Sequence, residues 1–392
     1  MRRHFTLDPD VVFLNHGAFG ACPAKVQEAQ SRFRTELERE PVRFFGTFLG
    51  STLDQARSEV AAFVGARPED LAFVQNTTTG VSAVLRSLHF QPGDALLTTN
   101  HTYGACRNAL DFTAKRAGAE VIVANLPIPS DGPEDVVRRI TEAAVSAGPR
   151  VKLALIDHVT SPTGLVLPIV DIVRALRERG VDTLVDGAHG PGMVELDVNA
   201  IGAAYYVGNF HKWVCSPKGA AMLWVREDRQ TGVHPGVISH GYTSTRNRSR
   251  FLEEFDWTGS DDPSAWLCVP EAIRFIGSLV PGGWPEVRRR NRALVLEARA
   301  LLSATLGAPL LAPESMIGSL ASLPLPDAAP GASRNPYEEP LHCALLEKYG
   351  IEVPAFIWPA PPSRLVRVAA HLYNTLEEFQ KLASALRTEL RL

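Results

Sequence analysis

Cysteine is scarce in this chain of 392 residues, and its distribution is irregular. The five cysteines stand at positions 22, 106, 215, 268 and 343, and no two of them form a CxxC pair. An odd number without regular spacing argues against a disulfide framework and against a zinc site, so we expect no metal. A reducing, cytoplasmic location fits this cysteine usage best.

Long apolar runs and an excess of one charge are also missing. The longest apolar stretches, such as residues 151–156, have the length of a strand and are far too short to span a membrane. The N-terminus carries two arginines but lacks the apolar core of a secretory signal. Because the formal net charge is −3, we expect neither nucleic acid nor a membrane as a partner.

Short apolar runs alternate with helical patterns between about residues 70 and 225. The runs with strand character cover residues 71–74, 95–98, 120–123, 151–156, 183–185, 203–207 and 220–225. Helical patterns cover residues 79–88, 133–147 and 168–179, and the last two begin at a proline. This alternation predicts an α/β fold, with a mostly parallel seven-stranded sheet covered by helices on both faces.

The pattern changes after about residue 262. Helices are expected at residues 264–279, 284–306 and 340–348, strands at 351–353 and 365–370, and a last helix that a capping box at Thr375 opens. We therefore divide the chain into a large domain of residues 31–262 and a smaller α+β domain of residues 263–392. The N-terminal segment, residues 1–30, is expected to join the smaller domain.

Two residues in the large domain suggest the chemistry. Asp186 follows the predicted strand 183–185, and Lys212 comes 26 residues later, between His211 and Trp213. Ligands of open α/β sheets bind at the carboxyl ends of strands. An aspartate that holds a pyridine nitrogen protonated, and a lysine whose amine condenses with an aldehyde, are how many enzymes hold pyridoxal 5'-phosphate (PLP).

Other polar residues at strand ends are candidates for the same cofactor site. Thr77 and Thr78 stand where a strand ends and a helix begins, a position that favours phosphate, although a simple helix cap explains them as well. Tyr103 is preferred over His101 as the ring that stacks on the cofactor. The remaining candidates for contacts to the cofactor ring or phosphate are His189, Ser161, Asn209 and His211.

Arg367 lies within the apolar run 365–370. A buried guanidinium needs a partner. The carboxylate of a substrate would provide a bidentate one. An internal salt bridge is an equally good explanation of the sequence at this point.

Together these segments resemble the class V aminotransferase family of PLP-dependent fold type I enzymes. The resemblance rests on residues 185–189, 209–213, 76–78 and 365–374, in the expected order along nearly the whole chain. Residues 13–20 and the segment around Tyr103 look most like the isopenicillin-N epimerase-like branch. The resemblance implies a homodimer with shared active sites, in which Thr258 reaches the phosphate of the neighbouring subunit, and Asn15 lies near the substrate entrance.

The expected activity is that of an enzyme on an amino acid, through an external aldimine and removal of the Cα proton by Lys212. Epimerisation is the first choice, and a C–S lyase, a cysteine desulfurase or an aminotransferase of the same family are alternatives. Epimerisation needs a second acid, for which Tyr103 and His16 are candidates. A regulator that binds PLP without catalysis is an alternative of another class, and a nicotinamide dehydrogenase is disfavoured because GxGxxG is missing.

Cysteine desulfurases of this family carry a nucleophilic cysteine in a His-Cys-Ala context, which residues 342–344 match in letters. Because Cys343 falls in a predicted helix, we expect it to be inert. The substrate itself does not follow from the sequence. We expect its pocket to draw on the N-terminal segment and on loops at residues 235–262 and 323–340. The arginine-rich stretch 243–250 would suit a second carboxylate, or it is a solvated loop.

Overall fold

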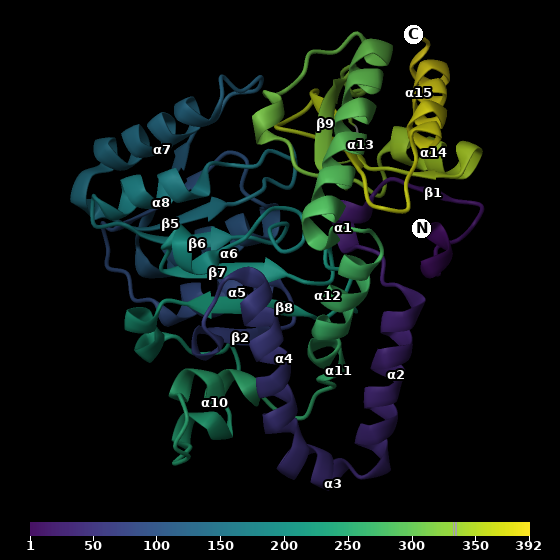
Figure 1. Cartoon of the computed structure of the whole chain (residues 1–392). Coiled ribbons are helices and arrows are strands. Elements are labelled where there is room, and N and C mark those ends of the chain that lie inside the picture. Colours follow the sequence, from purple (N-terminus) through teal and green to yellow (C-terminus); the bar gives the residue numbers. More distant parts are fainter. Residues whose placement is uncertain (332, 334) are drawn as a thin grey trace.

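A seven-stranded sheet forms the centre of the protein, as a computed structural model that describes residues 1–331, 333 and 335–392 shows (Figure 1). The strand order is β2-β8-β7-β6-β5-β3-β4. Six strands run in the same direction, and β8 runs antiparallel to them. The strands are β2 (Leu71–Val74), β3 (Ala95–Thr99), β4 (Glu120–Ala124), β5 (Val151–Asp157), β6 (Asp182–Asp186), β7 (Tyr205–Asn209) and β8 (Ala221–Val225). All seven strands predicted from the sequence are confirmed.

Helices cover both faces of this sheet because side chains along each strand point alternately to opposite faces. In β5, Leu153 and Leu155 belong to one apolar cluster, and Ala154 and Ile156 belong to the other. The first cluster includes α5 (Thr77–Ser87), α6 (Gly104–Ala117) and α10 (Arg250–Asp256). The second includes α4 (Leu49–Val64), α7 (Pro133–Ala147) and α8 (Ile169–Arg177).

The C-terminal part contains a smaller antiparallel sheet of order β11-β12-β9. Its strands are β9 (Leu320–Leu325), β11 (Ala355–Ile357) and β12 (Arg364–Ala369), and its helices are α13 (Gly283–Leu306), α14 (Pro340–Tyr349) and α15 (Leu376–Leu390). Near the other end of the chain, β1 (Val12–Phe13) pairs in parallel with β10 (Ile351–Glu352). The N-terminal segment therefore lies against the C-terminal part (Figure 1). The proposed domain boundaries themselves stay a prediction.

The remaining helices connect these parts. They are α1 (His16–Phe19), α2 (Ala24–Arg39), α3 (Pro41–Arg43), α9 (Val198–Ile201), α11 (Ser264–Leu267) and α12 (Val269–Ser278). In Figure 1, α2, α3 and the start of α4 extend at the bottom of the view, away from the smaller sheet. No helix in the described ranges is long and apolar enough to cross a bilayer.

Three sequence predictions need correction. The helix expected over residues 264–279 is interrupted at Cys268, because Pro270 has no amide hydrogen with which to continue it. The expected loop 323–340 begins inside β9, where Pro324 is accommodated because β9 is an edge strand. The expected loop 235–262 contains α10, whose Phe251, Leu252 and Phe255 are buried. The capping box at Thr375 is confirmed.

Candidate active site

The carboxyl ends of the central parallel strands meet at one edge of the sheet and border a cavity of about 540 Å³. β5 ends at Asp157, β6 at Asp186 and β7 at Asn209, and Lys212 follows β7 by three residues. Nine residues predicted for the cofactor site line this cavity, namely Thr77, Thr78, Tyr103, Ser161, Asp186, His189, Asn209, His211 and Lys212.

The Lys212 amine lies inside the cavity beside a neutral imidazole. Its Nζ is 3.1 Å from Nε2 of His189, and the Trp213 indole donates to Nδ1 of the same ring at 3.2 Å. Burial, followed by the charge of Lys212, holds the pKa of His189 well below its usual value, so the ring is neutral. With Nδ1 acting as an acceptor, Nε2 carries the proton and can donate a hydrogen bond to Nζ once Lys212 has lost its own proton.

Desolvation also lowers the pKa of Lys212 to about 8, and the positive charge of Arg367 adds to this effect. A lysine with such a pKa is largely cationic at pH 7, but it releases its proton far more readily than a solvent-exposed lysine does. The position between His189 and the cavity therefore suits an amine that acts as a nucleophile and as a base.

Asp186 is buried, and both of its carboxylate oxygens accept hydrogen bonds. Oδ2 accepts from the Cys106 thiol and Oδ1 from the backbone N–H of Ala188, each at 3.0 Å. Burial is the main reason why its pKa is raised. No cation within the described part of the chain forms an ion pair with it, so a protonated ring nitrogen would be its natural counterion.

A second buried carboxylate, Asp157, was missed by the sequence analysis. It is paired in register with Asp186 on the neighbouring strand, and burial followed by the charge of Asp186 raises its pKa well above the usual value. Its Oδ1 accepts from the backbone N–H of Tyr103 at 3.3 Å, whereas Oδ2 has no hydrogen-bond partner in the described structure. The available signal was its position one residue beyond the predicted strand 151–156, which matches the position of Asp186 after its own strand.

The start of α5 forms another wall of the cavity. Asn76 caps the helix by accepting from the backbone N–H of Thr79 at 2.9 Å, and Asn209 accepts from that of Thr77 at 3.0 Å. The Thr77 hydroxyl is buried and has no hydrogen-bond partner among the described atoms. Free hydroxyl groups at a helix N-terminus favour an anion.

A neighbouring cavity of about 450 Å³ shares Tyr103, Ser161 and Lys212 with the first and contains Arg367 and Asn15. Arg367 donates from Nη1 to the Ser161 carbonyl and hydroxyl, at 2.6 and 3.1 Å. In the described part of the chain it forms no salt bridge, so the alternative of an internal ion pair is wrong. Desolvation lowers its pKa to about 10, and the group remains cationic.

Several sequence candidates lie elsewhere. Thr258 lines neither cavity of this chain. His101 is buried, hydrogen-bonds with the Thr163 hydroxyl and the Leu126 carbonyl, and does not line the cavity, so of these two candidates only Tyr103 lies in the site. Cys343 lies within α14, as predicted, and lines neither cavity.

His16 is buried against the backbone of Lys212 and lines neither cavity. Its Nδ1 is 2.7 Å from the Tyr373 hydroxyl and its Nε2 is 3.1 Å from the Lys212 carbonyl. Possible ligand atoms of His16, Cys215 and His371 lie within 4.8 Å of one another, but these residues line neither cavity. His16 is therefore in no position to exchange a proton with a ligand in the site.

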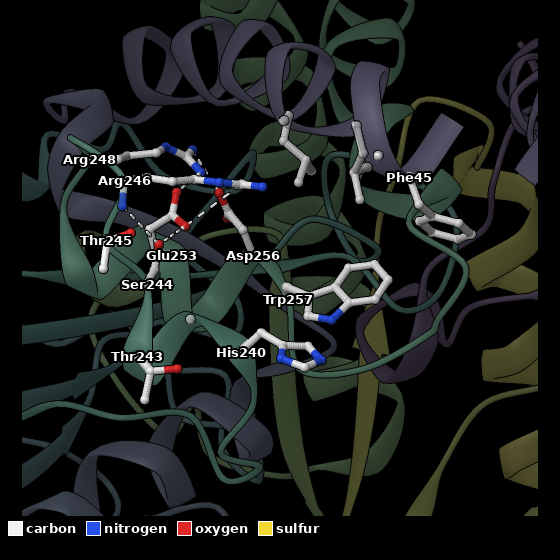
Figure 2. Close-up of a pocket in the computed structure, with 15 residues that line it drawn as sticks. Phe45, His240, Thr243, Ser244, Thr245, Arg246, Arg248, Glu253, Asp256 and Trp257 are labelled. Atoms are coloured by element: carbon white, nitrogen blue, oxygen red, sulfur yellow. Dashed lines mark hydrogen bonds and ion pairs between the residues drawn. The ribbon is translucent and has the colours of Figure 1, made fainter. Parts of the chain in front are cut away.

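The stretch 243–250 borders a separate cavity of about 550 Å³ next to α4 and α10 (Figure 2). There Arg248 forms ion pairs with Asp54, Glu253 and Asp256. None of the arginines of this loop lines the Lys212 cavity or the cavity beside it in the same chain. The prediction that residues 235–262 line the substrate pocket is wrong for this chain alone, because residues 354–358 take that place.

Comparison with known proteins identifies a matching family and several relatives of this chain. The profile of the class-V aminotransferase family matches residues 12–325. Isopenicillin N epimerase of Streptomyces clavuligerus is 35% identical over 98% of this chain and 96% of its own length. A protein of Arabidopsis thaliana named "Probable L-cysteine desulfhydrase, chloroplastic" is 32% identical over 97% of this chain and 83% of its own length.

A solved structure of a mutant of the enzyme C-DES, with glycine covalently linked to its PLP cofactor, superimposes with a TM-score of 0.82. It is 20% identical and covers 98% of both chains, so it shows the fold, which is PLP fold type I as predicted. The predicted resemblance to the epimerase-like branch is also confirmed.

The residues present fit PLP. The cavity of about 540 Å³ has the size of a small-molecule site. It offers an amine for the aldehyde in Lys212, a buried carboxylate for the ring nitrogen in Asp186, and an unpaired buried hydroxyl for the phosphate in Thr77.

Proposed function

Because the chain belongs to the class-V aminotransferase family of PLP-dependent enzymes, we propose that it removes the Cα proton of an amino acid and acts as an epimerase of the isopenicillin-N type. One observation carries the proposal. Lys212 lines both the cavity that contains Asp186 and the cavity that contains Arg367, so the proposed cofactor and substrate sites meet at this residue.

We assign the residues of the first cavity to the cofactor. Lys212 attaches it, Asp186 keeps its ring nitrogen protonated, and Tyr103 stacks on the ring. His189, Ser161 and Asn209 contact ring substituents or their surroundings, and the hydroxyls of Thr77 and Thr78, together with His211, bind the phosphate. When bound, the cofactor supplies an electron sink for the negative charge that develops at the substrate Cα.

The second cavity would hold the substrate. Nη2 and Nε of Arg367 have no partner in the described structure, so the guanidinium can bind the α-carboxylate while Ser161 fixes Nη1. The Asn15 amide donates to Glu352 at 2.8 Å, and its buried Oδ1 has no partner among the described residues. That oxygen is available to accept a hydrogen bond from the substrate. The Lys212 amine then takes the Cα proton.

Epimerisation also requires a proton donor on the face opposite Lys212. Of the two candidates from the sequence, only Tyr103 borders both cavities. Burial is the main cause of its raised pKa, which keeps the phenol protonated and able to donate. We therefore assign Tyr103 this second role.

A C–S lyase is the second candidate, because the desulfhydrase of Arabidopsis thaliana is nearly as similar as the epimerase. Expulsion of a sulfur group from the side chain would then follow removal of the same Cα proton. A desulfurase that works through a cysteine persulfide is disfavoured by the position of Cys343 in α14, outside both cavities. An aminotransferase would share the same residues.

A homodimer also belongs to the proposal. The family resemblance implies that Thr258 of a second copy reaches the phosphate, and Thr258 of the same chain lines neither cavity. The free state of all five cysteines supports the proposed cytoplasmic location.

The test uses Lys212→Ala, with the exposed Lys115→Ala as the matched control. We expect wild-type protein and the control to bind PLP covalently, seen as a mass increase after borohydride reduction, and to exchange the Cα hydrogen of amino acids in deuterated water. Lys212→Ala should lose both properties. Chiral analysis and detection of sulfide separate an epimerase from a lyase. Covalent PLP and full exchange in Lys212→Ala would refute the proposal.

A further inference from the structure

The second cavity extends well beyond the groups that an α-amino acid needs for its carboxylate and amine. Lys212 lines both cavities, and Arg367 donates a hydrogen bond to Ser161, which also lines both. If these two groups bind the amine and the carboxylate, the substrate Cα is fixed between them. The side chain must then occupy the remainder of the space of about 450 Å³, which is bounded by the N-terminal segment and by residues 354–358.

The walls of this remainder are mainly apolar and aromatic. Phe356 and Ile357 of β11 and the following Trp358 form one wall, and all three are half-buried. Phe19 at the end of α1 and Tyr337 also line this cavity and are exposed, and Phe19 borders the cofactor cavity as well. Trp358 is held by an edge-to-face contact with His101, at 4.8 Å between ring centroids. Half-buried and exposed aromatic rings around an open cavity would gain from contact with apolar ligand atoms.

Few side chains in this remainder of the cavity could pair with a charged group in the substrate side chain. Among the described lining residues, Lys212 and Arg367 are the only lysine or arginine, and both are assigned to the amino acid backbone. His342 is buried, and its Nδ1 already hydrogen-bonds with the Val353 carbonyl at 2.9 Å. Among the described residues that line the cavity, a side-chain carboxylate would therefore find no further cation as a counterion, which is unfavourable.

We propose that the substrate is an α-amino acid with a large apolar side chain, branched or aromatic, which packs on Phe356, Ile357 and Trp358. This inference rests on the proposed function, since it takes Lys212 and Arg367 as the anchors of the amino acid. A small side chain such as that of alanine or cysteine would leave most of the cavity to water, and a dicarboxylic amino acid would bury a second charge that no described lining residue pairs.

The test compares Cα-hydrogen exchange of leucine and phenylalanine with that of alanine, cysteine and glutamate, using the holoenzyme. One methylene in an apolar pocket is worth about 10- to 200-fold in kcat/KM. We therefore expect kcat/KM for leucine and phenylalanine to exceed that for the other three by at least about tenfold. Equal or higher kcat/KM for alanine, cysteine or glutamate would overturn the inference.

The variant Phe356→Ala tests the wall itself. The control is Phe112→Ala, which removes the same side chain from an exposed position on α6 outside both cavities. Phe356→Ala should lower kcat/KM for leucine and phenylalanine several times more than for alanine, mainly through KM. Phe112→Ala should change neither. Ile357→Ala provides the same test if Phe356→Ala does not fold, as judged by circular dichroism. A uniform loss across all amino acids in both wall variants would contradict the inference.

Failure of the proposed function can be distinguished from failure of the inference about the pocket. If no amino acid exchanges its Cα hydrogen, the proposed chemistry is wrong, and calorimetric binding to the holoenzyme then decides the inference on its own. Tighter binding of leucine than of alanine and glutamate, weakened by Phe356→Ala, would support the apolar pocket. Equal binding of all three would refute it.

Discussion

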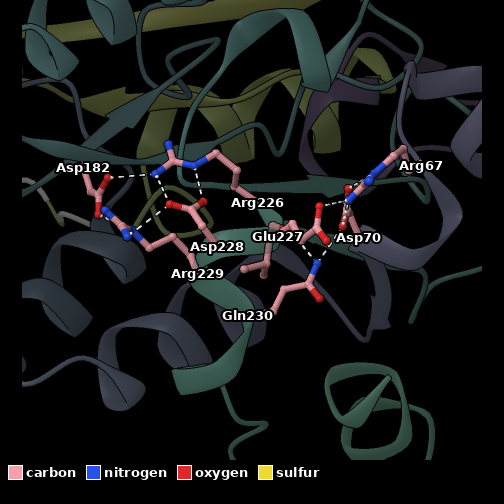
Figure 3. A network of polar contacts seen from close by, with 9 residues as sticks. Arg67, Asp70, Asp182, Arg226, Glu227, Asp228, Arg229 and Gln230 are labelled. Carbon is pink, nitrogen blue, oxygen red and sulfur yellow. Dashed lines mark hydrogen bonds and ion pairs between the residues drawn. The ribbon is translucent and has the colours of Figure 1, made fainter. Parts of the chain in front are cut away.

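Asp182 and Asp186 are the first and last residues of β6, and their surroundings differ sharply. Asp182 is partly exposed and pairs with Arg226 at 3.5 Å and with Arg229 at 2.7 Å (Figure 3). Asp186 is buried, has no salt bridge in the described structure and accepts hydrogen bonds from a thiol and a backbone amide. An aspartate at one end of β6 is thus partly exposed and forms ion pairs. The aspartate at the other end is buried and has no cationic partner in the described structure.

The polar groups at the two edges of the sheet, where these two residues lie, differ in a similar way. Near Asp182, Arg67 pairs with Asp70 and Glu227, and Gln230 donates to Asp70, so most polar groups there have partners (Figure 3). At the opposite edge, buried oxygens of Thr77 and Asp157 have none among the described atoms. Buried polar groups without partners are unfavourable unless a ligand satisfies them. Thr183 Oγ1 and Trp224 Nε1, near the Asp182 edge, also lack partners among the described atoms, but only Thr77 and Asp157 line the Lys212 cavity. The cavity, and not the unpaired atoms alone, therefore marks the edge that receives a ligand.

Replacing the buried member, Asp186→Asn, should have the largest effect. Asparagine keeps the size of the side chain but cannot balance the charge of a protonated ring nitrogen. We expect Cα-hydrogen exchange to slow by about 10²–10³-fold, the loss typical of one electrostatic group in an active site. The rate is measured at saturating PLP, with bound cofactor determined separately by absorbance. Exchange within about threefold of wild type would show that Asp186 does not serve the cofactor.

Replacing Lys212 by Met should have an effect of intermediate size. It should raise the stability of the cofactor-free protein rather than lower a measured property. Without cofactor, the buried amine has a pKa of about 8 rather than 10.5, mainly through desolvation. The unfolded chain therefore binds this proton more tightly, and unfolding takes up a proton between about pH 8 and 10.5. The contribution of Lys212 to stability is thus least favourable below pH 8 and improves as the pH rises through this range.

We expect cofactor-free Lys212→Met to be more stable than cofactor-free wild type by about 1–3 kcal/mol at pH 7. The difference should shrink as the pH rises toward 10.5. Thermal unfolding of both proteins, after removal of PLP, measures it, and Lys115→Met controls for the loss of a lysine as such. A less stable Lys212→Met variant at pH 7 would show that the amine is well solvated in the folded protein.

Much of this arrangement was predictable from the sequence because it depends on local patterns. The apolar runs and the residues at their ends locate Asp186, Thr77 and Lys212 without knowledge of tertiary structure. Parallel strands then bring their carboxyl ends together. Asp157 was missed since the predicted strand stopped one residue short, and its pairing with Asp186 depends on the order of strands in the sheet.

The substrate pocket was less predictable because its walls come from distant segments. Residues 354–358 line it only because β11 pairs with β12 and thereby lies next to Arg367. The loop 235–262 was expected there instead, but α10 buries Phe251, Leu252 and Phe255 against another part of the sheet. Contacts between residues far apart in the sequence decide which of these segments lines the pocket. The periodicity of apolar residues does not reveal such contacts.

The smallest effect is expected for Asp182→Asn. Its ion pairs with Arg226 and Arg229 join side chains that are 27–40% exposed, so water and salt screen them. Exposed pairs contribute about 0–1 kcal/mol. Denaturant unfolding should therefore show a loss of less than about 1 kcal/mol, reduced further in high salt, and Cα-hydrogen exchange should match wild type. A large loss of exchange in this variant would mean that the two ends of β6 are coupled, and that the separation of a stabilising edge from a binding edge does not hold.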